Sequence, residues 1–143
     1  MMLVVDVNVV FSSLINSGTS LRVFEMNKML RKFELVVPEY FFFEMGLRVD
    51  KILSFTHFSK SEFSKTLSFI KSELEIIPLS SFDDMTGKAE SLSPDEKDVA
   101  YIALALKFGC KVLSGDKKLK EALPELIATP SEALNILLGR NEP

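Results

Sequence analysis

The stretch CKVLSGDKKLK, residues 110–120, joins a short apolar run to an acid, Asp116. The stretch MLVVDVNVVF, residues 2–11, has the same form, since Asp6 directly follows three apolar residues. Apolar runs this short, bounded by polar residues or glycine, are typical of buried strands. Because helical sequence separates the two stretches, they predict two strands of one sheet whose acids gather at a common edge.

The remainder of the chain alternates between short apolar runs and longer helical patterns. This alternation predicts an α/β fold, a three-layer α/β/α sandwich with a mainly parallel central sheet of four or five strands. In such sheets ligands bind outside the carboxyl ends of the strands, where both acids are expected. The length fits one domain, 1–143. The expected strands are 3–5, 35–37, 75–77, 111–114 and 126–128, and the expected helices are 9–15, 21–31, 38–53, 61–72, 83–92, 98–108, 117–123 and 131–138.

Local signals suggest how two of these helices begin. Pro38 is expected at the first position of helix 38–53, where its missing N–H has no partner to lose. The segment from Ser93 to Glu96 has the form of a capping box, with Ser93 as the cap of the Ala-rich helix. The aromatic run 41–43 is expected in the core rather than on the surface.

The composition excludes several kinds of site. Cys110 is the only cysteine and His57 the only histidine, so neither an internal disulfide nor a Cys/His zinc cluster is available. A Walker-type phosphate loop is absent, and no serine or cysteine has a histidine base. The net charge of −3 argues against a generally basic nucleic-acid-binding surface. The sequence shows neither a signal peptide nor a membrane-length apolar run, so we expect a cytoplasmic protein with no membrane partner.

The acids that follow strands or begin helices could instead cap helices or complement helix dipoles. For Asp6 we favour a functional role, because Asn8 is available to cap helix 9–15. For Asp116 the sequence gives equal support to a role in a functional site and to a role as the cap of helix 117–123. Asp98 is favoured for function because Asp95 and Glu96 already complement the helix dipole, and this leaves Asp95 as a secondary candidate.

Glu44 lies within an aromatic helix, six residues after Pro38. Its carboxylate either reaches solvent at the helix edge or turns inward to the site, and the residues alone leave both open.

Convergence of these acids would require a cation. Two carboxylates about 4 Å apart repel by roughly 4 kcal/mol at the effective dielectric of a protein surface. Without histidine or cysteine, the donors form an all-oxygen site that suits Mg²⁺ or Mn²⁺. Asn8 and Ser114 could add neutral oxygens as accessory polar groups. The chemistry that such a site favours is metal-assisted attack of water on a phosphodiester.

Four segments together resemble the motifs of PIN domains, in order and spacing, over nearly the whole chain. They are VVDVNVVFSSLI at 4–15, LVVPEYFFFEM at 35–45, SPDEKDVAYIALAL at 93–106 and VLSGDKKL at 112–119. The resemblance implies an α/β/α sandwich and a Mg²⁺- or Mn²⁺-dependent ribonuclease, with RNA as substrate. It also implies that the chain could be the toxin of a toxin–antitoxin pair with an antitoxin partner. One departure is Val7, before Asn8, where many members have threonine or serine.

Carried onto this chain, the resemblance implies a role for each candidate residue. The catalytic and metal-binding acids would be Asp6, Glu44, Asp98 and Asp116, with Asn8 and Ser114 as accessory polar groups and Asp95 as the nearby ambiguous acid. Lys117, Lys118 and Arg48 are the candidates for binding phosphates.

Two other functions remain open from the sequence. The same fold could bind RNA or a protein without cleaving, with the acids serving as caps. A small phosphohydrolase could use Asp6 as a covalent nucleophile, although Asn8 and Lys117 stand where that class generally has acids. An apolar patch from the aromatic run 41–43 or the helix from Leu21 could also support a homodimer, if these side chains are not in the core.

Overall fold

The computed structural model describes residues 1–140; the expected domain, 1–143, includes residues 141–143, which lie outside the described part. Within residues 1–140, every helix is too short or too polar to cross a membrane. In chain order the elements are β1 (Met2–Val5), α1 (Val7–Ile15), α2 (Thr19–Leu30), β2 (Glu34–Pro38), α3 (Tyr40–Phe55), α4 (Lys60–Ser72), β3 (Leu74–Ile77), the 3₁₀ turns η1 (Leu79–Ser81) and η2 (Asp83–Met85), α5 (Thr86–Leu92), the 3₁₀ turn η3 (Glu96–Asp98), α6 (Val99–Phe108), β4 (Lys111–Leu113), α7 (Lys117–Ala122), β5 (Ile127–Ala128) and α8 (Pro130–Leu137).

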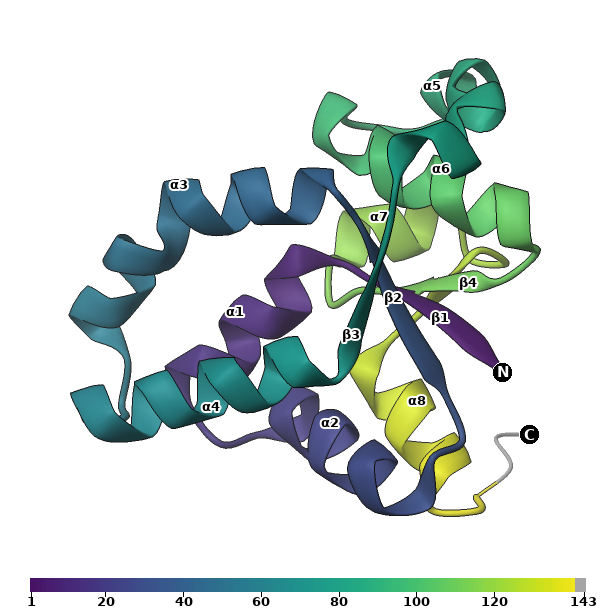
Figure 1. Ribbon diagram of the computed structural model, residues 1–143. Coiled ribbons are helices and arrows are strands. Elements are labelled where there is room, and N and C mark those ends of the chain that lie inside the picture. Colours follow the sequence, from purple (N-terminus) through teal and green to yellow (C-terminus); the bar gives the residue numbers. More distant parts are fainter. Residues whose placement is uncertain (141–143) are drawn as a thin grey trace.

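The strands form one parallel sheet in the order β3-β2-β1-β4-β5, which confirms the predicted α/β fold (Figure 1). The chain adds strands on one side of β1 and then on the other, so the order reverses between β1 and β4. In parallel sheets this reversal opens a crevice at the carboxyl ends of the strands. Val5 of β1 pairs with Leu113 of β4, so the residues that follow them, Asp6 and Ser114, emerge side by side.

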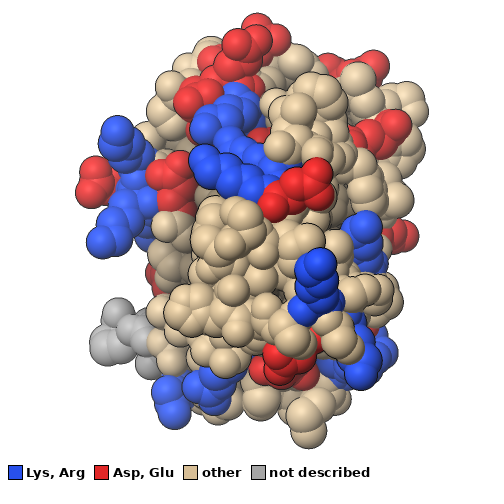
Figure 2. All heavy atoms as spheres, turned by 90° about the vertical axis from the view of Figure 1, so that its left-hand side faces the viewer, with Lys and Arg blue, Asp and Glu red and all other residues tan. Residues whose placement is uncertain are grey.

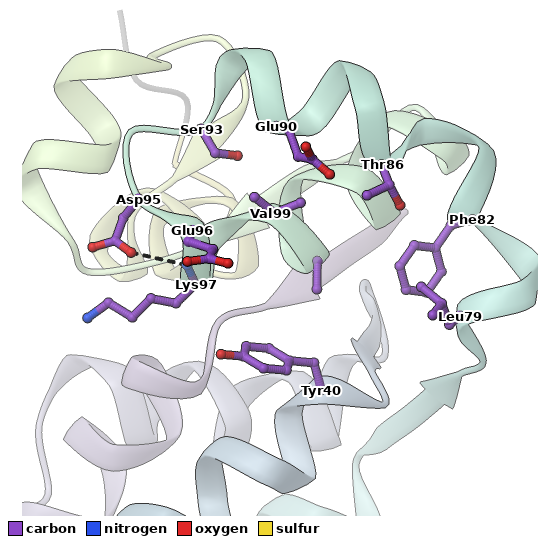
Figure 3. Close-up of a pocket in the computed structure, with 11 residues that line it drawn as sticks. Tyr40, Leu79, Phe82, Thr86, Glu90, Ser93, Asp95, Glu96, Lys97 and Val99 are labelled. Atoms are coloured by element: carbon purple, nitrogen blue, oxygen red, sulfur yellow. Dashed lines mark hydrogen bonds between the residues drawn. The ribbon is translucent and has the colours of Figure 1, made fainter.

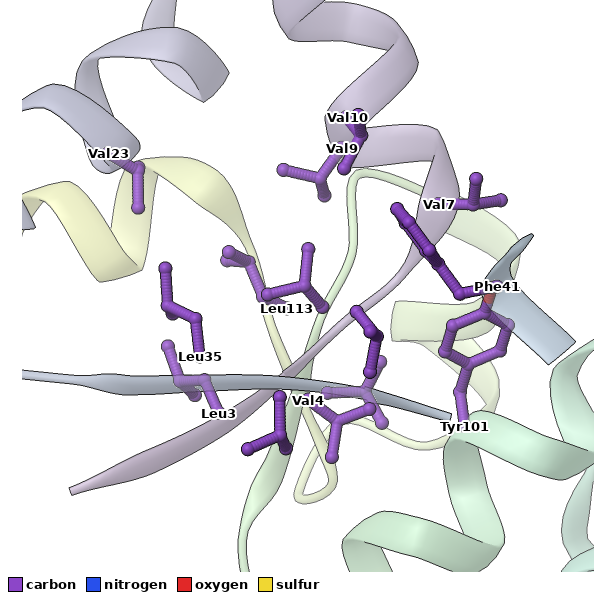
Figure 4. Close-up of a cluster of buried hydrophobic side chains, with 14 of the residues drawn as sticks. Leu3, Val4, Val7, Val9, Val10, Val23, Leu35, Phe41, Tyr101 and Leu113 are labelled. Carbon is purple, nitrogen blue, oxygen red and sulfur yellow. The ribbon is translucent and has the colours of Figure 1, made fainter. Parts of the chain in front are cut away.

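Helices cover both faces of the sheet. The apolar helix α6 lies against β1, β2 and β4, and α2 packs against α1 and α8 on the opposite face. Leu3, Val4 and Val5 are 3%, 0% and 0% exposed. Successive strand residues point to opposite faces, and Figure 4 shows Leu3 turned toward Val23 of α2 while Val4 turns away. An all-apolar strand is therefore required at the centre, and the acid can appear only where the strand ends.

The expected helix starts at Pro38 and Ser93 are wrong. Pro38 is the last residue of β2, where it pairs with Ile77 of β3, and α3 begins at Tyr40. The pairing of β1 with β2 ends at Val36, so proline beyond that point removes no hydrogen bond from the β1–β2 pair. Ser93 ends α5 and donates its hydroxyl to the Ala89 carbonyl, while Asp95 caps the η3 turn.

The expected burial of the aromatic run 41–43 is only partly right. Phe41 is fully buried, whereas Phe42 and Phe43 are 41% and 60% exposed. Consecutive helical residues are separated by about 100°, so three in a row cannot all face one core. The helix α3 therefore presents apolar side chains to solvent.

Candidate functional site

Asp6 is a buried carboxylate at the centre of the sheet edge. It follows β1, its backbone N–H donates to the Leu113 carbonyl at 3.0 Å, and only 7% of the residue is exposed. Its Oδ2 accepts hydrogen bonds from the Ser114 hydroxyl at 2.9 Å and from the Asn8 amide at 3.0 Å. Burial raises the pKa of Asp6, and the hydrogen bonds from the Ser114 hydroxyl and the Asn8 backbone N–H oppose the rise in part. The hydrogen bonds hold the Asp6 side chain in one orientation, while burial disfavours the negative charge on its carboxylate.

Ser114 and Asn8 link Asp6 to Asp116 across the gap between β1 and β4. The Asp116 N–H donates to Ser114 Oγ at 3.1 Å, and the Gly115 N–H donates to Asn8 Oδ1 at 3.4 Å. Ser114 is fully buried. The structure therefore brings together both predicted accessory polar groups and two of the predicted acids.

Both aspartates also cap helices. Asp6 Oδ1 accepts from the Asn8 N–H at 3.4 Å at the start of α1, so the expectation that Asn8 caps this helix is wrong. Asp116 Oδ1 accepts from the N–H groups of Lys118 and Leu119 at 3.0 and 3.2 Å at the start of α7. Within residues 1–140, Oδ2 of Asp116 receives no hydrogen bond. A cap uses only part of a carboxylate, so capping and cation binding are compatible.

Glu44 turns inward from α3 rather than outward to solvent. The residue is 6% exposed, and its Oε1 accepts a hydrogen bond from the Tyr101 hydroxyl of α6 at 2.6 Å. Burial raises the pKa of Glu44, the Tyr101 hydrogen bond opposes the rise, and the negative charge of Asp6 adds to it. Glu44 therefore lies within electrostatic reach of Asp6.

Asp98 is an acid whose surroundings strongly disfavour a charge. It is half-buried in η3, immediately before α6, and its side chain forms no cap hydrogen bond. Burial, and then the negative charges of Asp6, Asp116 and Asp95, raise the pKa of Asp98 to about 6. The aspartates from three separate parts of the chain thus act on one another. The secondary candidate Asp95 is exposed and accepts from the Lys97 N–H at 3.1 Å.

The cations around these acids include one that the sequence did not single out. Lys97 lies between Asp95 and Asp98 in the chain, and its charge lowers the pKa of Asp6, Glu44 and Asp98. Its position in the run PDEKD was the only sequence signal. The predicted phosphate-binding residues are exposed: Lys117 and Lys118 on the first turn of α7, and Arg48 on α3, where its guanidinium lies 5.9 Å from the centre of the Phe11 ring.

The donor chemistry of the site fits a hard divalent cation, because the predicted ligands offer carboxylate, amide and hydroxyl oxygens. The raised pKa values of Asp6, Asp98 and Glu44 fit as well, since burial and neighbouring negative charges raise them and a cation would oppose both effects. Within residues 1–140, however, no three His, Cys, Asp or Glu side chains are close enough together to hold a metal ion as they stand. Binding would therefore require some carboxylates to turn toward one another.

Comparisons with known proteins agree with this architecture. The sequence model of the PIN domain matches residues 4–124. The crystal structure of PAE2754 from Pyrobaculum aerophilum is similar, with a TM-score of 0.68 and 15% identity, over 98% of this chain and 91% of that chain. VapBC2 from Rickettsia felis, solved bound to a DNA fragment from its promoter, matches with a TM-score of 0.63 and 14% identity, over 90% of this chain and 98% of that chain. No curated protein matches the sequence. At these identities the two structures show a shared fold.

Proposed function

The chain belongs to the PIN domain family, and on that basis we propose that it is a divalent-metal-dependent endoribonuclease that hydrolyses RNA phosphodiesters. PIN domains are generally nucleases and generally depend on divalent metal ions. The observation that carries the proposal here is the set of acids at the reversal between β1 and β4. The pKa of Asp98, raised to about 6 by burial and by Asp6 and Asp116, indicates negative charge gathered where a cation would be stabilising.

In this proposal the metal ligands are Asp6, Asp98, Asp116 and Glu44, and the ion is Mg²⁺ or Mn²⁺. When bound, such an ion supplies an activated water and stabilises charge on the departing oxygen. The protein's own groups prepare the ligands. Ser114 and Asn8 hold Asp6 in place, and the Tyr101 hydroxyl holds Glu44 inward.

The proposed phosphate contacts come from cations that lie close to three of the acids along the chain. Lys97 precedes Asp98, Arg48 follows Glu44 by one turn of α3, and Lys117 and Lys118 follow Asp116. A local cluster of this kind attracts a phosphate backbone despite the negative net charge.

The test is cleavage of single-stranded RNA by the purified chain with Mn²⁺ or Mg²⁺, compared with Asp6→Asn. We expect Asp6→Asn to abolish cleavage and to weaken Mn²⁺ binding measured by calorimetry. The matched control is Asp50→Asn, at an exposed position on α3. A chain that cleaves none of a varied set of RNAs, together with equal Mn²⁺ affinity in Asp6→Asn, would contradict the proposal.

A binding module without catalysis is the second candidate, and two observations favour it. Asp6 and Asp116 both serve as helix caps, and within residues 1–140 no three acids are gathered around an ion position. RNA binding that is insensitive to EDTA and to Asp98→Asn would favour this function over catalysis. We do not propose a covalent Asp6 nucleophile, since Asp6 is buried, both its carboxylate oxygens accept hydrogen bonds, and the residue two positions later is Asn8 rather than an acid.

A protein partner is also part of the proposal. The similar structure from Rickettsia felis is VapBC2 bound to promoter DNA, which supports an antitoxin as the partner. Exposed apolar side chains on α3 would suit such a contact, and Figure 2 shows uncharged atoms across the middle of the face that carries the tips of α3 and α4. This α3 surface consists of Phe42, Phe43, Leu47, Leu53 and Phe55.

Light scattering of the purified chain separates an antitoxin from a second copy of the chain. A homodimer that Leu47→Lys dissociates would assign the α3 surface to self-association. A monomer that binds an antitoxin through the same residue would assign it to the partner.

A further inference from the structure

A cavity of about 840 Å³ lies beside the acids, and of its lining residues only Lys97 has a proposed role, as a phosphate contact. Its walls come from the start of α3, from the segment after β3 together with α5, and from the η3 turn and the first residues of α6 (Figure 3). Small-molecule sites in proteins have volumes of about 300–1,000 Å³. The cavity is therefore large enough to receive one nucleobase with its sugar.

The cavity adjoins the proposed catalytic acids through two of its walls. Val99 directly follows Asp98, and Tyr40 stands one turn before Glu44 on α3. The Tyr40 ring lies edge-on to the Tyr101 ring, with 6.5 Å between ring centres, and Tyr101 donates to Glu44. A strand of RNA whose phosphate lay at the acids would bring an adjoining base to this cavity.

One wall of the cavity offers an aromatic surface. Tyr40 is 37% exposed, and the Phe43 ring stacks on it with 5.8 Å between ring centres, which restricts its movement. Figure 3 shows the Tyr40 ring below the η3 turn, across the space from Thr86 and Glu90 of α5. Stacking of a base on an aromatic side chain is a common means of binding single-stranded RNA.

The charged groups of the cavity favour a base over a phosphate. Three acids line it, Glu90, Asp95 and Glu96, against one cation, Lys97. Carboxylates accept hydrogen bonds, so they select a ligand edge that donates. Guanine presents its N1–H and N2–H side by side to one carboxylate. Uracil presents a single imino N–H between two carbonyl oxygens, and adenine and cytosine each present one amino group beside a ring nitrogen that accepts. Within residues 1–140 the carboxylates of Glu90 and Glu96 accept no hydrogen bond, whereas one oxygen of Asp95 accepts from the Lys97 N–H, so the two glutamates offer more free acceptor oxygens.

We propose that this cavity binds the nucleobase next to the cleaved phosphate and selects guanine, with Tyr40 as the stacking surface and Glu90 and Glu96 as the acceptors. The inference rests on the proposed function, because it takes RNA as the substrate. It adds a preference for one base in the RNA, and it assigns that preference to residues that are not among the proposed metal ligands.

Binding is measured first in EDTA, so that the result does not depend on cleavage. The methyl groups of Thr86, Val99 and Ala100 line the cavity and report on it in ¹H–¹³C spectra. We expect GMP to shift these methyl signals with an affinity about tenfold higher than that of UMP or IMP, because IMP lacks the 2-amino group. Glu90→Gln and Glu96→Gln should each weaken GMP binding about tenfold, and Glu121→Gln on α7 should not.

Cleavage supplies the second arm and separates the two proposals. RNAs that differ only by guanine or uracil at each position beside a fixed cleavage site should show the preference, and Tyr40→Ala should reduce it. Cleavage without base preference, together with methyl signals that respond equally to GMP and UMP, would overturn the cavity assignment and leave the nuclease intact. Guanine-selective binding that depends on Glu90 or Glu96 in a chain that never cleaves RNA would support the cavity and refute the nuclease. Methyl shifts stronger with N-acetyl-arginine amide than with GMP would assign the cavity to a basic peptide and overturn the proposal.

Discussion

Replacement of Asp98 by asparagine should stabilise the protein at neutral pH when no divalent metal is present. Asp98 is half-buried, and its side chain forms no cap hydrogen bond that the substitution would remove. Burial, and then the negative charges of Asp6 and Asp116, raise its pKa from the ordinary 3.8 to about 6. Asparagine keeps nearly the same shape and removes the charge that these neighbours oppose.

The size of this gain in stability follows from the pKa of Asp98. A rise from 3.8 to about 6 corresponds to an upper bound of about 3 kcal/mol in the free energy of unfolding. Solvent screens a half-buried group, so we expect a gain of about 1–2 kcal/mol for Asp98→Asn.

The sign of the pH dependence is also determined. Because the folded-state pKa is raised, wild-type protein gains stability from this group as pH falls through about 6 and has gained it fully below about 4, where both states are protonated. The gain in free energy of unfolding from Asp98→Asn should therefore be largest above about pH 7 and absent near pH 4.

Urea unfolding from pH 4 to pH 8 in EDTA measures this effect, with Asp50→Asn as the exposed control. Saturating Mn²⁺ should then reverse the order, since binding to the folded state alone adds about 2.7 kcal/mol at 100 times the dissociation constant. A variant that is less stable than wild type at every pH, or equally stable at every pH, would refute the reasoning.

Three further substitutions test the supporting contacts. Ser114→Ala should lower the free energy of unfolding by about 2 kcal/mol in urea titrations, because it removes a donor to buried Asp6 and an acceptor of the Asp116 N–H; an unchanged midpoint would contradict this role. Tyr101→Phe should raise the pKa of Glu44 further, because it removes a hydrogen bond that stabilises the charged carboxylate. Carbon NMR titration of the Glu44 carboxyl measures this pKa, and a decrease or no change would contradict the prediction. Thr129→Ala, which removes the cap of α8, is a control for general loss of stability. It should lower the free energy of unfolding by about 1 kcal/mol and leave the Mn²⁺ affinity unchanged. A reduced Mn²⁺ affinity would show that the metal measurement responds to stability alone.

The strands and their shared edge were predictable because they depend on local signals. An apolar run that is buried on both faces must end before the first acid, so Asp6 and Asp116 mark the ends of β1 and β4. The parallel arrangement then brings these two ends together without any further information. The general location of the site thus followed from the sequence.

The parts that the sequence left open, missed or predicted wrongly depend on tertiary context. Pro38 could end a strand as well as begin a helix, and its place was decided by where the β1–β2 pairing stops. The direction of Glu44 was set by Tyr101, a residue 57 positions away in the chain. Lys97 gave no periodic signal, since only the folded turn before α6 brings it near the acids.

A crystal structure with Mn²⁺, located by its anomalous scattering, tests the central claim most directly. The account predicts Mn²⁺ bound to carboxylate oxygens from more than one of Asp6, Glu44, Asp98 and Asp116, with these side chains turned toward the ion. Bound Mn²⁺ only at other positions, or none at saturating concentration while all four carboxylates keep their separate orientations, would contradict it.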